Sequence, residues 1–159
     1  MSQTYPQELL ELSYGSFFGG VCEIHITKQS DDTAECVIEG LNGWGWFLEA
    51  EEFTFPAAEC ETLRLKVAPV LKWKKEYQCE GIILDGHGWD ICSHFGRAKK
   101  SHGYMAYPDD YESVMNGILA CIESIRAYDP SDKKNTPLLD PCECGSFFCA
   151  GKRNPGDQT

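Results

Sequence analysis

The chain has 159 residues, which is the usual length of one domain and enough to bury a substantial hydrophobic core. Apolar residues make up 42% of it, but no run approaches the roughly 18–20 apolar residues of a membrane-spanning helix, so we expect no membrane span. The net charge of −11 disfavours nucleic acid, and the opening residues lack the pattern of a secretory signal, which predicts a cytoplasmic location.

The first half of the chain predicts an antiparallel hairpin. After a short polar lead, residues 21–27 and 33–39 each alternate apolar and polar side chains, and a turn-forming Gln-Ser-Asp-Asp lies between them. The aromatic, glycine-punctuated segment 41–48 predicts a loop or bulged strand that leads into an extended segment at 53–55.

A first helix is predicted to begin near Pro56, which suits an initial helical turn. Pro69 should end or kink this helix, because proline lacks the N–H that a helix interior requires. The apolar residues at helical spacing are Cys60, Leu63, Val67, Val70 and Leu71.

The second half predicts another hairpin, from a short strand at 82–84 through the turn 85–88 to a strand at 89–95. Residues 96–101 form the next predicted turn, and 103–107 an extended segment that Pro108 ends. Asp109 or Asp110 can then cap the clearest helix of the chain. Its apolar stripe is Tyr111, Val114, Met115, Ile118, Leu119, Ile122 and Ile125.

This order of elements predicts an α+β fold, with an antiparallel sheet of four to six strands and two helices packed on one face. We expect residues 1–130 to form a single domain. Residues 131–159 form a tail that contains proline, glycine and cysteine, for which we expect partial order.

Residues 83–111 contain Leu84-Asp-Gly-His-Gly-Trp89 and Ser101-His-Gly-Tyr-Met-Ala-Tyr-Pro108, followed by an acidic-capped helix. This pattern resembles small bacterial α+β proteins in which an Asp-Gly-x-x-Trp hairpin leads to a Ser-x-Gly-x-x-Ala-Tyr-Pro segment. The resemblance covers about residues 70–125. It implies structural roles only: a turn at Asp85-Gly86, a core position for Trp89, and a helix lead-in at Tyr107-Pro108. Many toxin-neutralising immunity proteins are also small, acidic and α+β, which makes them a useful analogy.

The acidic charge is concentrated near the start of the chain, where residues 1–60 hold eleven acids and one lysine. Such a surface favours a basic protein partner, although acidic charge also serves solubility alone. Large aromatic rings beside acids are typical of an interface core with a charged rim, and equally of an ordinary core. The partner-binding residues predicted on this basis are Trp44, Trp46, Phe47, Glu49, Glu51 and Glu52.

Two groups of residues suggest metal chemistry instead. Cys142, Cys144 and Cys149 could occupy three corners of a zinc tetrahedron. His94 is the fourth ligand we favour, with His87, His102 and Cys79 as alternatives, but packing or redox roles also suit the tail thiols. The cluster of His87, His94 and His102, with Asp90 on the strand face of His94, could form an acid/base or metal site. Solvated surface histidines are the simpler interpretation.

The leading hypothesis is therefore a non-enzymatic binding protein, such as an immunity protein, with a basic protein partner and no cofactor. A zinc-binding protein or metal-dependent hydrolase that uses the tail cysteines and the histidines is one alternative. A structural accessory domain is another.

Overall fold

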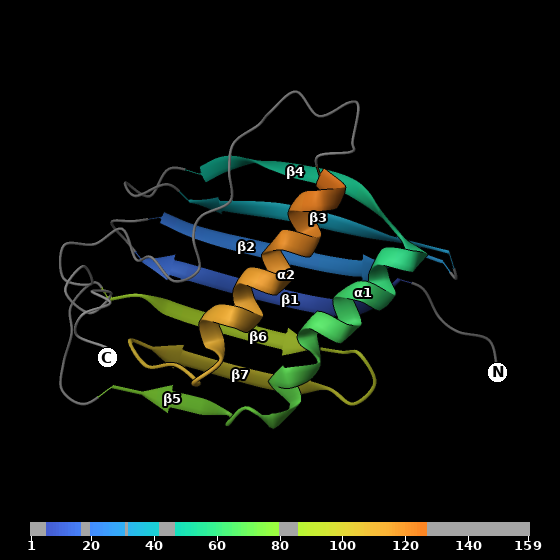
Figure 1. The fold of residues 1–159 in the computed structure, drawn as a ribbon. Coiled ribbons are helices and arrows are strands. Elements are labelled where there is room, and N and C mark those ends of the chain that lie inside the picture. Colours follow the sequence, from blue (N-terminus) through green and yellow to red (C-terminus); the bar gives the residue numbers. More distant parts are fainter. Residues whose placement is uncertain (1–5, 17–19, 31, 42–46, 80–85, 127–159) are drawn as a thin grey trace.

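The computed structural model describes residues 6–16, 20–30, 32–41, 47–79 and 86–126. It has an α+β architecture in which two helices lie on one face of a twisted sheet (Figure 1). The strands are β1 (Gln7–Ser16), β2 (Gly20–Lys28), β3 (Thr33–Leu41), β4 (Phe47–Pro56), β5 (Glu76–Gln78), β6 (Gly88–Ser93) and β7 (Lys99–Tyr104). The helices are α1 (Ala57–Val67), a short 3-10 helix (Ala68–Lys72) and α2 (Tyr111–Arg126).

The sheet has the strand order β4-β3-β2-β1-β6-β7-β5. Strands β1–β4 form an antiparallel meander, β6 pairs with both β1 and β7, and β5 pairs in parallel with β7. The prediction of an α+β fold is confirmed. The predicted four to six antiparallel strands are corrected to seven strands in a mixed sheet, counted over the described residues.

Strand β1, at the centre of the sheet, was expected to be only a polar lead. A bulge between Glu8 and Leu10 shifts the register against β2, so that Leu9 and Leu10 are both buried although they are adjacent in sequence. The bulge breaks the two-residue alternation by which a strand is recognised. Beyond it the alternation is regular, with Leu12 and Tyr14 buried.

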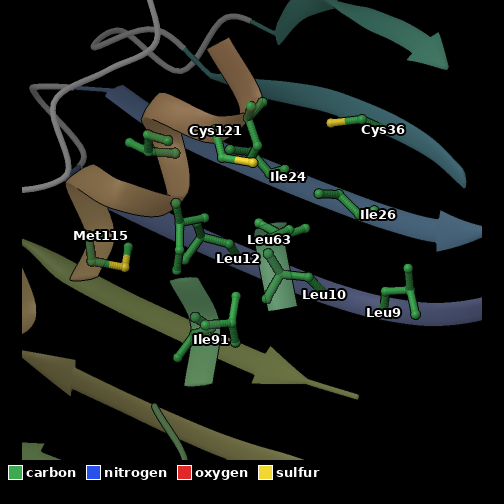
Figure 2. Packing of buried hydrophobic residues seen from close by; sticks show 14 of the residues in the cluster. Leu9, Leu10, Leu12, Ile24, Ile26, Cys36, Leu63, Ile91, Met115 and Cys121 are labelled. Carbon is green, nitrogen blue, oxygen red and sulfur yellow. The ribbon is translucent and has the colours of Figure 1, made fainter. Parts of the chain in front are cut away.

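The hydrophobic core lies between the sheet and the two helices. Leu10 and Leu12 of β1 and Ile24 of β2 point toward Met115 of α2 and Leu63 of α1, as Figure 2 shows. Side chains of this kind each contribute roughly 1.5–3 kcal/mol when fully buried, so this layer accounts for much of the stability of the fold. The predicted apolar stripe of α2 is buried along its whole length.

Pro69 acts as predicted, because α1 ends at Val67 and the chain continues as the 3-10 helix. Leu63, Val67 and Val70 are buried, whereas Leu71 is 42% exposed and does not join the core as expected. Among the described helices, none is both long enough and apolar enough to cross a membrane.

In the second half, β6 pairs with β7 in a hairpin that was not predicted. The expected hairpin of 82–84 with 89–95 stays a prediction, because 82–84 lies outside the described residues, and β6 ends at Ser93 rather than at 95. Strand β7 begins at Lys99, inside the predicted turn 96–101, and ends at Tyr104 rather than continuing to 107. It ends there because Met105 has a φ of 55°, which is incompatible with a strand. Trp89 is buried as the resemblance implied, and a Cβ on Gly103 would lie 2.6 Å from its Nε1 atom.

Candidate functional site

The face of the sheet opposite the helices is not covered by any helix in the described part of the chain (Figure 1). Because side chains alternate along a strand, the residues between the buried positions project from this second face, which we call the open sheet face. Its carboxylates on the described strands are Glu8, Glu11, Glu23, Glu35, Glu39, Glu52, Glu76 and Asp90. Lys100 is a lysine on the same face.

Near the middle of the open sheet face, imidazole, thiol and carboxylate groups converge. The Nε2 atom of His94 lies 3.2 Å from Cys92 Sγ and 3.5 Å from Glu11 Oε2. The other Glu11 oxygen, Oε1, lies 3.9 Å from His25 Nδ1, and His25 Nε2 lies 3.8 Å from Glu23 Oε1. One carboxylate therefore lies between two imidazoles.

The pairing of β1 with β6 creates this cluster. Glu11 lies directly opposite Cys92 in the ladder, and the His94 backbone N–H donates to the Leu9 carbonyl, which extends the pairing beyond β6. Burial raises the pKa of the Cys92 thiol, and the neighbouring Glu11 carboxylate raises it further. The thiol is therefore protonated at neutral pH unless a cation approaches it.

The predicted partner-binding residues have separate locations. Glu52 is exposed on the open sheet face. Glu51 faces the helices, where its carboxylate accepts hydrogen bonds from Arg126 Nε at 2.7 Å and Nη2 at 2.9 Å. Trp44 and Trp46 lie outside the described residues, as do the side chains of Phe47 and Glu49 in β4.

The three predicted histidines do not form one cluster. His87 is buried, with Nδ1 3.1 Å from the Tyr107 hydroxyl. His102 lies opposite Asp90 on the open sheet face. His94 contacts Cys92 and Glu11 on the same face, so Asp90 and His94 share a face as predicted. Cys142, Cys144 and Cys149 lie outside the described residues, so their proposed pairing with His94 stays a prediction.

A groove of about 770 Å³ lies beside the edge strand β5, lined by Trp73, Tyr77 and Tyr107. The polar atoms of these rings are used within the fold. Trp73 Nε1 donates to Asp110 Oδ1 at 2.8 Å, and the Tyr77 hydroxyl accepts from the Lys74 backbone N–H at 2.9 Å. The aromatic residues that line the groove therefore serve the packing of this edge of the sheet.

Sequence reasoning missed Glu11, His25 and Cys92 as members of a site. The Cys-x-His spacing at 92 and 94 was available as a signal, because alternate residues of a strand share a face. Nothing local, however, places Glu11 beside them. Comparison of the chain with protein-family models, curated proteins and solved structures gives no match, so the resemblance described above stays a prediction.

Proposed function

We propose that the protein is a non-enzymatic binding protein whose open sheet face docks onto a basic protein surface. The observation that carries this proposal is the gathering of carboxylates on a face that no described helix covers. An immunity protein that blocks a cationic toxin is the specific case we favour.

The arrangement of the acids argues against solubility as their sole purpose. Glu23 and Glu39 are both exposed and lie directly opposite each other on β2 and β3. Like charges at opposed positions of a sheet destabilise it, so the pair has an energetic cost that dispersed surface charge would avoid. Such local conflicts are typical of functional surfaces, where a partner compensates for them.

The charge would act mainly on the rate of association. Carboxylates spread over neighbouring strands produce a field that attracts a cationic partner, and this field is screened over about 8 Å at physiological ionic strength. Electrostatic steering raises association rates by about 10- to 1000-fold. The on-rate should therefore fall steeply as salt is added.

The test begins with affinity capture of partners by the full chain, followed by purification of each partner for stopped-flow association. The variant to compare is Glu23→Lys/Glu39→Lys/Glu52→Lys, which reverses three exposed charges on the open sheet face. We expect its on-rate to be at least tenfold lower than that of the wild type, with a weaker dependence on ionic strength.

A matched control reverses three exposed acids on the helix side, at Glu61, Asp109 and Glu112. This control changes the net charge equally but leaves the open sheet face intact. Equal effects of the two triple variants, or an on-rate insensitive to salt, would contradict the proposal.

A further inference from the structure

We propose that Glu11, Cys92 and His94 form a binding site for a divalent ion of the zinc class. This inference does not depend on the proposed partner binding. It also differs from the zinc hypothesis based on the tail, because it uses only residues that the structure brings together.

The backbone places the three ligands on one side of two paired strands. Cys92 and His94 are alternate residues and project from the same face, and Glu11 is the direct cross-strand partner of Cys92. The ligand atoms of all three residues lie within 4.8 Å of one another. No chain rearrangement is needed to bring them together.

The separations fit a tetrahedral ion. Zinc bonds of roughly 2.0–2.3 Å to nitrogen, oxygen and sulfur, at tetrahedral angles, place neighbouring ligand atoms about 3.3–3.6 Å apart. The His94 Nε2 atom lies 3.2 Å from Cys92 Sγ and 3.5 Å from Glu11 Oε2. The two separations that involve His94 therefore already match such a site, and the Cys92 and Glu11 ligand atoms lie within 4.8 Å of each other.

The donor set and its surroundings favour this class of ion. A thiolate with an imidazole suits zinc-like ions, whereas magnesium and calcium prefer sites made only of oxygen atoms. Glu8, Glu11 and His25 also gather closely, which adds negative charge beside the site. His25, 3.9 Å from the second Glu11 oxygen, is placed to orient that carboxylate as outer residues of metal sites do.

The site would also leave one coordination position open. Three protein ligands are the usual number where a fourth position takes water or an exchangeable ligand, whereas closed structural sites supply four. The side chains of His94 and Glu11 are 32% and 43% exposed, so an ion can reach them from solvent. Binding would displace the thiol proton of Cys92 to solvent, because the thiolate is the ligand form.

The experiment uses the full chain with Cys142, Cys144 and Cys149 changed to serine, so that the tail cannot contribute thiolates. Cobalt(II) is titrated into this reduced protein, and its absorption spectrum is recorded. We expect thiolate-to-cobalt charge-transfer absorption together with the intense visible bands of a tetrahedral site. Zinc should abolish both at one equivalent.

Two further changes locate the site. Cys92→Ser should remove the charge-transfer absorption, and His94→Gln should weaken cobalt binding at least tenfold. The matched controls are Cys79→Ser and His102→Gln, which should leave both signals unchanged. Because His94 is partly exposed, its variant should fold, and zinc should raise the Tm of the tail-substituted protein but not of that protein with His94→Gln.

The proposal would be overturned if the tail-substituted protein showed no charge-transfer absorption. It would equally be overturned if that absorption survived Cys92→Ser. Loss of the signal in the His102→Gln control, with His94→Gln unaffected, would place the ion elsewhere on the open sheet face.

Discussion

Helix α2 ends in an ion pair whose removal should severely destabilise the protein. Arg126 donates two hydrogen bonds to Glu51 and a third, from Nη1 at 2.8 Å, to Glu123 Oε1. The side chains of Arg126 and Glu51 are only 8% and 16% exposed. The hydrogen bonds to Glu51 raise the pKa of Arg126 above its usual range, so the pair is charged at any ordinary pH.

Replacing Arg126 by methionine leaves the Glu51 carboxylate in a poorly solvated position without a cation. Breaking a buried pair in this way costs about 3–5 kcal/mol, and the residual exposure of Glu51 places the expected loss near the lower limit, at about 3 kcal/mol. That is a large share of the roughly 5–15 kcal/mol that stabilises an ordinary domain. Urea-induced unfolding, followed by circular dichroism at neutral pH, measures the loss.

The double variant Arg126→Met/Glu51→Met separates two contributions to the loss of stability. One is the cost of leaving the Glu51 carboxylate buried without a cation, and the other is the loss of the attraction between Arg126 and Glu51. Apolar replacements of a buried ion pair are often neutral or stabilising, so the double variant should be more stable than Arg126→Met alone. Glu123→Gln should cost less than about 1 kcal/mol, because that carboxylate is 40% exposed. This reasoning would be refuted if Arg126→Met lowered the free energy of unfolding by less than about 1 kcal/mol. It would also be refuted if the effect of the double variant equalled the sum of the effects of Arg126→Met and Glu51→Met.

Two other predictions concern the buried thiol of Cys22 and the hydrogen bond of the Trp73 indole. Burial raises the pKa of Cys22 from its usual 9.0 to about 11, so at alkaline pH the unfolded chain loses this proton before the folded chain does. Stability should therefore fall by roughly 1 kcal/mol between about pH 8 and pH 10. Cys22→Ala should lack this part of the fall in urea unfolding, and an identical pH dependence in the variant would contradict the assignment. Asp110→Ala should cost about 1.5 kcal/mol, because it removes the charged acceptor of the Trp73 indole N–H but Asp110 itself is exposed. Asp109→Ala, at an equally exposed position, should change stability little. If Asp110→Ala and Asp109→Ala had the same unfolding temperature, the hydrogen bond between Trp73 and Asp110 would contribute nothing to stability.

The elements that sequence predicted well are those with unbroken periodicity. The hairpin of β2 and β3 alternates without interruption, and α2 keeps its helical spacing over its whole length, so each pattern reports which side chains are buried. Strand β1 was missed because its bulge buries Leu9 and Leu10 together. The strand end at Met105 was missed for a similar reason, since a positive φ at methionine leaves no compositional signal.

The candidate site depends on pairings between distant parts of the chain, which local patterns do not contain. The shared face of Asp90 and His94 was predictable, because they lie four residues apart in an extended segment that continues beyond β6. The position of Glu11 beside Cys92 was not, because it requires β1 to pair with β6. The engagement of Glu51 by Arg126 likewise depends on the packing of α2 over β4, so an acid assigned to the surface is mostly buried.

The central position of β1 has a consequence for folding during synthesis. Strands β1–β4 pair with their neighbours in sequence, so this meander can form from short loops as soon as it leaves the ribosome. The other edge of β1 must wait for β6, which is made much later, and until then its backbone groups form a free edge beside Leu10 and Leu12. Free edges of this kind pair readily with other chains, so the interval before β6 emerges is when nascent chains of this protein are most prone to aggregate.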